Sequence, residues 1–149
     1  MRPRHVHRTH RNSHGFSLIE LVMVLLVFGI VLAFGIPSYW RYQQSQALRG
    51  TSENLVQTIQ LQRSRAMAVG QSVAINFNTA APAGWTVLAA GVSNQRQLPK
   101  GVTYASANPA SLTIDKSGRV NTSGLVVFQG RNGATDTVSV QISGMAVIR

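Results

Sequence analysis

The stretch that decides the fold is Gly15-Phe16-Ser17-Leu18-Ile19-Glu20-Leu21, and an apolar run follows it as far as Ile36. A basic segment stops at Gly15, and a single carboxylate, Glu20, lies near the start of the apolar run. With Phe16 to Ile19 included, the run approaches the roughly 20 residues that a membrane-spanning helix needs. A charged side chain inside such a helix costs roughly 2.5–3.5 kcal/mol on insertion scales, so Glu20 is predicted to be functional.

Three interpretations of this segment compete. An ordinary secretory signal peptide is one, because Ala33-Phe34-Gly35 loosely imitates an A-x-A cleavage site. The apolar run is, however, longer than the usual 7–15 residues or so of such a peptide. A plain signal anchor is the second, and it leaves the Gly15–Phe16 pair and Glu20 unexplained. A processed membrane helix, cut at the glycine, accounts for all of these features together.

This pattern resembles the class III signal of type IV pilins and type II secretion pseudopilins. The resemblance implies that a prepilin peptidase cuts between Gly15 and Phe16 and methylates the new N-terminal Phe16. It also implies that the carboxylate of Glu20 meets the positive N-terminus of a neighbouring pilin or pseudopilin during assembly. A residue without a Cβ before the cut allows close approach of the peptidase to the backbone, which is a physical reason for Gly15.

Charge is divided unevenly along the chain. The first 15 residues contain Arg2, Arg4, Arg8 and Arg11 and no acidic residue. Positive charge beside an apolar span predicts a cytoplasmic N-terminus, a single pass through the inner membrane and a periplasmic C-terminal portion. The resemblance adds that the protein is incorporated into a pilus or pseudopilus.

The segment after the apolar run has the period of an amphipathic helix. Pro37 lowers helix propensity and removes an internal hydrogen bond, so a helix break or local melting is predicted there. One face then repeats at steps of three and four residues, and Gly70 is a plausible stop. That face comprises Ala47, Leu48, Thr51, Leu55, Ile59, Gln62, Ala66 and Val69. A helix from Phe16 to about Val69 would be about 80 Å long at the usual rise per residue.

Beyond Gly70, short β-rich runs alternate with turn residues. The predicted strands are residues 72–78, 85–89, 102–105, 111–115, 125–129, 137–142 and 145–148. Turns are predicted at residues 80–84, 132–133 and 143–144. The expected fold class is therefore α+β, with a long N-terminal helix packed on a C-terminal antiparallel β-sheet as in pilins.

Four parts are predicted along the chain: a cleaved basic leader (1–15), a transmembrane half-helix (16–37), an amphipathic half-helix (38–70) and a β-rich globular domain (71–149). The order of the helix end, Gln62 to Val73, and the later strands resembles the GspH/FimT family of minor pilins and pseudopilins. Weaker likenesses are Trp85, residues 98–102 and residues 115–119. The resemblance implies a structural subunit that helps to initiate or cap a type II secretion pseudopilus or a type IV pilus.

The composition argues against an enzyme and against a cofactor or metal site. The chain has no cysteine, and its four histidines all precede the predicted cut. His10 and His14 could share a helical face, but a soluble polar leader explains them as well. Without histidine or cysteine, only a Ser-Lys pair using Lys100 or Lys116 could activate a nucleophile in the mature chain.

DNA binding is the alternative function. After the predicted cut, ten basic residues face four acidic ones, and a basic surface favours polyanions. The candidates for phosphate contact are Arg96, Lys100, Lys116, Arg119, Arg131 and Arg149. FimT-like proteins are associated with DNA uptake and favour an arginine-rich motif after a C-terminal glycine. Here Gly144 is followed by four uncharged residues before Arg149, which departs from that motif.

Overall fold

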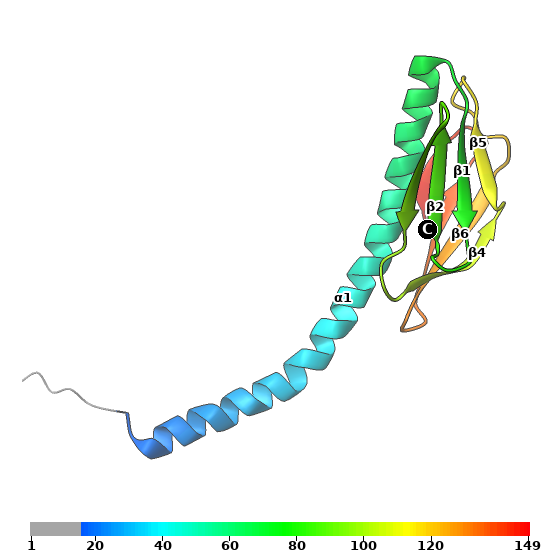
Figure 1. The fold of residues 1–149 in the computed structure, drawn as a ribbon. Coiled ribbons are helices and arrows are strands. Elements are labelled where there is room, and N and C mark those ends of the chain that lie inside the picture. The colour runs from blue at the N-terminus through cyan, green and yellow to red at the C-terminus, as the bar shows by residue number, and fades with distance from the viewer. Residues whose placement is uncertain (1–15) are drawn as a thin grey trace, which may run out of the picture. The chain divides into compact units, whose positions relative to one another are not determined.

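The computed structural model describes residues 16–149, except the side chains of residues 34–38. It divides into two compact units, one ending at Ser38 and the other comprising Tyr39–Arg149. A single helix, α1, is assigned over Leu18–Val69 (Figure 1). The predicted leader, residues 1–15, lies outside the described residues, and the predicted division into four parts stays a prediction.

Eight strands follow α1. They are β1 (Val73–Asn78), β2 (Gly84–Ala89), β3 (Val92–Gln97), β4 (Val102–Asn108), β5 (Ser111–Ile114), β6 (Gly124–Gly130), β7 (Thr135–Val140) and β8 (Ala146–Ile148). All pairings are antiparallel. The predicted α+β class, a long helix packed on antiparallel strands, is confirmed.

The strands form two four-stranded sheets rather than one. The first has the order β3-β2-β1-β5 and the second β4-β6-β7-β8. The chain crosses between the sheets three times, because β4 joins the second sheet, β5 returns to the first and β6 joins the second again. These exchanges bring the inner faces of both sheets onto one core.

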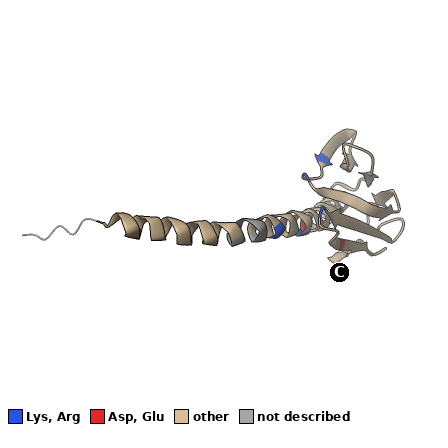
Figure 2. Cartoon of the chain, turned by 90° about the horizontal axis from the view of Figure 1, so that it is seen from below, with Lys and Arg blue, Asp and Glu red and all other residues tan. Residues whose placement is uncertain are grey.

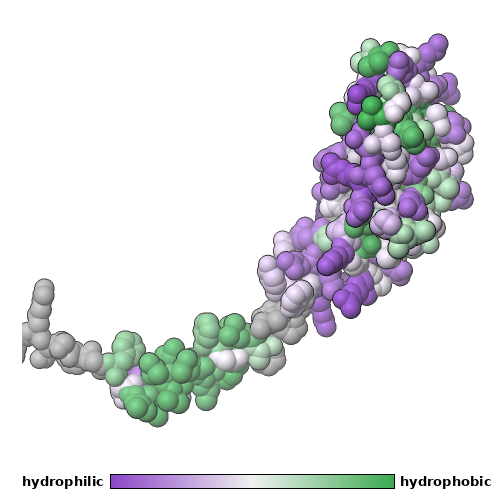
Figure 3. Space-filling model, viewed as in Figure 1, coloured by the Kyte–Doolittle hydropathy of each residue, from purple (hydrophilic) through white to green (hydrophobic). Residues whose placement is uncertain are grey.

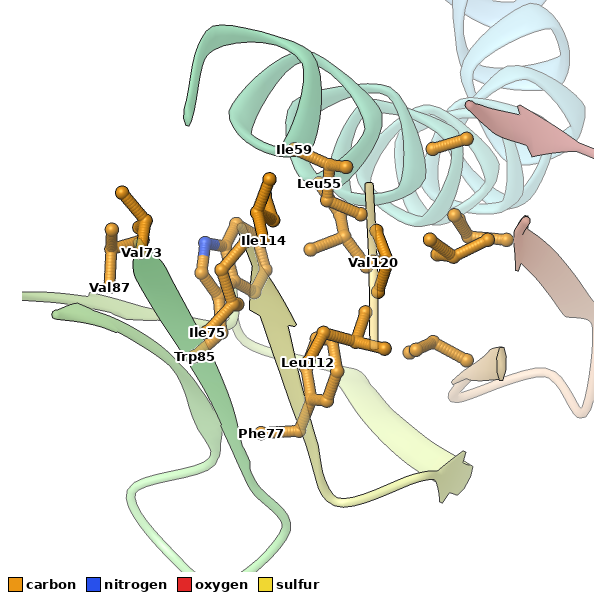
Figure 4. Packing of buried hydrophobic residues seen from close by; sticks show 14 of the residues in the cluster. Leu55, Ile59, Val73, Ile75, Phe77, Trp85, Val87, Leu112, Ile114 and Val120 are labelled. Atoms are coloured by element: carbon orange, nitrogen blue, oxygen red, sulfur yellow. The ribbon is translucent and has the colours of Figure 1, made fainter. Parts of the chain in front are cut away.

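The second half of α1 covers this core through the face that its period predicted. Leu55 and Ile59 are completely buried, and Leu48, Thr51, Gln62 and Ala66 are buried beside them. Figure 4 shows Leu55 and Ile59 directed toward Leu112 and Ile114 of β5 and toward Val120. Val69 is the exception, with 59 % of its surface exposed, because the helix ends there and Gly70 turns the chain at φ +71°.

Aromatic side chains join the two sheets. Trp85 of β2 lies 6.5 Å from Phe128 of β6, and Phe77 of β1 lies 6.3 Å from Tyr104 of β4, between ring centroids. The Tyr104 hydroxyl donates a hydrogen bond to the Gly84 carbonyl (O···O 2.8 Å), and burial raises the pKa of that phenol above its ordinary value. One buried cluster therefore contains residues of the helix and of both sheets.

Candidate assembly site

Glu20 lies in the first turn of α1. The backbone N–H groups of Glu20 and Leu21 donate to the Ser17 carbonyl, with N···O distances of 3.0 and 3.2 Å. Ser17 therefore occupies the position before the first helical residue, where serine is a preferred residue type. A carboxylate in a first turn also interacts favourably with the helix dipole. The local sequence thus accounts for where the helix begins and for a stable Glu20 there.

A row of apolar side chains continues from Glu20 along one face of the helix. Its members recur at steps of three and four residues and line a shallow groove: Glu20, Met23, Val24, Val27, Phe28 and Val31. The groove is almost entirely apolar beyond the carboxylate. Such a surface can pack against another apolar helix or against lipid chains.

The apolar surface surrounds this part of the helix and is not confined to the groove. Every large hydrophobic side chain from Phe16 to Leu32 is between 44 and 82 % exposed. Figure 3 shows this segment as a continuous hydrophobic surface. A helix that is apolar on all sides belongs in a nonpolar surrounding or in a protein core.

By hydropathy and length, no helix in the described part of the chain qualifies as a membrane span.

The structure describes Phe16, Gly15 and Pro37, the other residues predicted from the signal, to different extents. Phe16 is 76 % exposed and directly precedes the helix. Gly15 lies outside the described residues. Helix α1 is assigned through Pro37, whose side chain is also outside them. Cleavage after Gly15, methylation of Phe16 and a break at Pro37 all stay predictions.

Two of the four carboxylates in residues 16–149, those of Glu53 and Asp115, have partners within this range, whereas those of Glu20 and Asp136 have no ion pair there. Glu53 pairs with Arg49 (Nε···O 3.1 Å), and Asp115 accepts hydrogen bonds from the Ser117 hydroxyl and two backbone N–H groups. Among residues 16–149 the Arg49–Glu53 contact is the one ion pair, so Glu20 has no cation beside it in that range. A charge partner for Glu20 would have to come from outside these residues.

The six basic residues predicted for DNA contact do not form one patch. Lys116 and Arg119 lie in the turn that follows β5, at the end of the strands near Gly70. Arg96 lies on the edge strand β3, and Lys100 and Arg131 lie next to the paired ends of β4 and β6, where Val102 is opposite Gly130. Arg149 follows β8.

Figure 2 shows the basic residues as separate blue segments and not as a continuous stripe. Phosphate-driven binding depends on several cations that track one backbone. Nothing in this arrangement favours DNA over a solvated basic surface, and DNA contact stays a prediction.

The described residues contain no group of three or more histidine, cysteine, aspartate or glutamate side chains that could hold a metal ion. Their four carboxylates are those of Glu20, Glu53, Asp115 and Asp136, on α1, in a turn and on β7.

Two family models match the sequence. The prokaryotic N-terminal methylation motif matches residues 10–36, and the type II transport protein GspH matches residues 51–145, which is more than half of the chain. The chain belongs to the GspH family. It is accordingly a structural subunit of the pilin and pseudopilin class and not an enzyme, as the sequence predicted.

Solved structures show the same fold as this GspH-family chain. The type IV minor pilin FimU of Pseudomonas aeruginosa strain PAO1 is similar with a TM-score of 0.58 and 16 % identity, over 72 % of this chain and 92 % of that one. The minor pseudopilin EpsH from the type 2 secretion system of Vibrio cholerae gives 0.54 and 18 %, over 68 and 95 %. No curated protein sequence matches the chain significantly.

Proposed function

We propose that the chain is a minor pilin-like subunit that is anchored in the bacterial inner membrane and helps to initiate or cap a short filament. The filament would be the pseudopilus of a type II secretion system or a type IV pilus. One observation carries the proposal: a GspH-family domain follows an N-terminal methylation motif whose helix presents uncovered apolar side chains on all sides.

The exposed apolar helix needs to be covered both before and after assembly. Each large apolar side chain gains about 1.5–3 kcal/mol when it leaves water, so the segment from Phe16 to Leu32 is unfavourable in solvent. A bilayer covers it before assembly. The helices of neighbouring subunits cover it afterwards, and the groove beginning at Glu20 is the face on which one of them would lie.

Glu20 gives that packing a polar contact. After cleavage, the amine of Phe16 is the N-terminus, and methylation leaves it cationic. A neighbour's amine within about 4–6 Å of the Glu20 carboxylate would offset part of the cost of removing both charges from water. The contact would also fix the axial register between subunits, as single buried polar groups do in coiled coils.

Mass spectrometry of the membrane-extracted protein tests the processing step. We expect an N-terminus at Phe16 carrying one methyl group, and a Gly15→Leu variant that keeps all 15 leader residues. His14→Ala is the matched control, since it changes the neighbouring leader residue and should still be cleaved. An unmethylated or different N-terminus in the unmodified chain would refute the claim of prepilin-peptidase processing.

A strain from which the gene is deleted tests whether the protein serves a type II secretion system or a type IV pilus. Secreted enzyme activity and surface pili are measured with and without complementation by the full-length gene. Loss of secretion alone assigns the chain to a type II system, and loss of pili alone assigns it to a type IV pilus. A deletion that changes neither contradicts a role in filament initiation or capping.

A further inference from the structure

Four consecutive residues of α1, Tyr39-Trp40-Arg41-Tyr42, combine large rings with polar or charged ends. Tyr39, Trp40 and Tyr42 are 61, 60 and 62 % exposed, and Arg41 is exposed as well. Among the side chains of α1 that the structure describes, the first buried one comes later, at Leu48. These rings therefore take no part in the core of the Tyr39–Arg149 unit.

The four side chains surround the helix. Successive residues of an α-helix are rotated by about 100°, so four in a row point to all sides of it. A ring that packed on a partner protein would be expected to occupy one face, as the apolar row from Leu48 to Ala66 does. A complete collar of aromatic and cationic side chains instead fits a surrounding that is the same on every side.

The sequence on either side of the collar changes from apolar to polar. The apolar run ends at Ile36, and the collar is followed by Gln43-Gln44-Ser45-Gln46. Tyrosine and tryptophan are enriched where hydrocarbon meets headgroups, because their rings are apolar and their O–H and N–H groups need hydrogen bonds. An arginine there extends its guanidinium toward phosphate and water.

We propose that residues 39–42 form an interfacial collar, which binds the headgroup region of the outer leaflet of the inner membrane and sets the depth of the helix before assembly. The proposal rests on the membrane anchor proposed above. The 20 residues from Ile19 to Ser38 span about 30 Å as a helix, which is the hydrocarbon thickness of a bilayer. With the collar at one interface, Phe16 therefore lies at the opposite one, where the peptidase must reach it.

Trp40 reports directly on this depth. The full-length chain and a Trp40→Phe variant are reconstituted in vesicles of phosphatidylcholine and phosphatidylglycerol. Trp85, buried in both proteins, contributes equally, so the difference spectrum belongs to Trp40. We expect a blue-shifted Trp40 emission that is quenched at least twofold more by lipids brominated near the headgroup than by lipids brominated near the chain ends.

The outcomes separate the collar from the anchor. A chain that stays in the vesicle pellet after alkaline carbonate washing, but whose Trp40 emits as in water and is not quenched by brominated lipid, overturns the collar alone. Strongest quenching by the deepest bromines also overturns it. A chain that carbonate removes from the vesicles overturns the membrane anchor and the collar together.

Substitution of the three rings tests the depth-setting role. The chain has no cysteine, so a Ser45→Cys substitution accepts a single fluorescent dye just beyond the collar. When Tyr39→Gln, Trp40→Gln and Tyr42→Gln are added to this variant, we expect quenching of the dye by lipids brominated near the headgroup to change at least twofold. The matched control, Leu61→Gln with Val69→Gln, alters side chains that are 64 and 59 % exposed elsewhere on α1 and should leave quenching unchanged. Equal quenching in the collar variant and the unmodified chain would overturn the role.

Discussion

The two halves of α1 have the same backbone conformation and opposite relations to their surroundings. From Phe16 to Leu32 every large apolar side chain is uncovered, whereas from Leu48 to Ala66 one face is buried by the strands. The first half is apolar on all sides, and the second is apolar on one. The pattern of apolar residues therefore records what each half is to be packed against, namely a surrounding outside the chain or a sheet within it.

This difference separates two kinds of residue that look alike in sequence. In the second half, the stability of the chain itself depends on the apolar row. In the first half, every large apolar side chain from Phe16 to Leu32 is exposed, so substitutions there should affect membrane insertion and assembly. Glu20→Ala and Leu55→Ala test this separation, and two changes in turns test the strands on which the second half packs, in decreasing order of expected effect.

Glu20→Ala should reduce incorporation into filaments at least tenfold. Cleavage after Gly15 and the thermal stability of the chain should stay unchanged. The reason is that Glu20 contacts no cation within residues 16–149, so its partner is expected on another subunit. Incorporation is measured by cross-linking to other pilins in membranes. Glu53→Ala is the control, because it removes another exposed carboxylate, from the second half of the helix. Normal incorporation of Glu20→Ala would remove the pairing role.

Leu55→Ala should lower the free energy of unfolding by about 2–5 kcal/mol, because it removes a completely buried side chain from the contact between helix and strands. Leu61→Ala makes the same chemical change on the exposed side of the helix and should cost no more than about 0.5 kcal/mol. Urea unfolding of residues 39–149 measures both. Equal losses would mean that this half of α1 does not stabilise the unit.

Ala90→Asn should stabilise the same unit by roughly 0.5–1 kcal/mol. Ala90 and Gly91 connect β2 to β3 with φ angles of +51° and +78°, which is the two-residue turn in which Asn-Gly is preferred. A positive φ is unfavourable for a residue with a Cβ, and among such residues asparagine tolerates it best. Urea unfolding again gives the value, and a destabilised variant would contradict the turn assignment.

Acid should weaken the unit through Asp115. Hydrogen bonds from the Ser117 hydroxyl and the backbone N–H of Arg119 hold the pKa of this carboxyl below its ordinary value of about 3.9. Because the folded pKa is the lower one, the contribution is complete above about pH 4 and is lost as the pH falls through the folded value.

Asp115→Asn keeps the shape of the side chain and removes its titration. The stability gap between this variant and the unmodified chain should narrow between pH 7 and about pH 3. The effect is the smallest of the four, since the carboxyl is exposed to solvent. A gap that stays constant over this range would contradict the role of the ionised carboxylate.

Periodicity predicted the helix and most of the strands, and it failed where packing alone decides. Val73, Ile75 and Phe77 alternate with more exposed residues in β1, as their spacing indicated. Strand β3 was missed because it lies at a sheet edge and all six of its residues are exposed, so its sequence carries no apolar alternation. Its turn, Ala90-Gly91, also lacks the usual Asn-Gly signature.

Of the candidate assembly site, the sequence indicated the helix start and Glu20, because a charge in an apolar run is visible without coordinates. It did not indicate the collar at residues 39–42. Rings at consecutive positions have no helical period, and only their exposure on every side of α1 distinguishes them from core residues.

The sequence by itself determined the apolar segment, the N-terminal methylation motif, the buried face of the helix and the α+β class, because these depend on local composition and on spacing of three to four or two residues. Tertiary structure decided the division of the strands into two sheets, the exchange of β4 and β5 between them and the separation of the basic residues to different ends. These features depend on contacts between residues far apart in the chain, such as Trp85 with Phe128. No local pattern specifies which distant strands will pair, because the inner faces of the strands are similarly apolar.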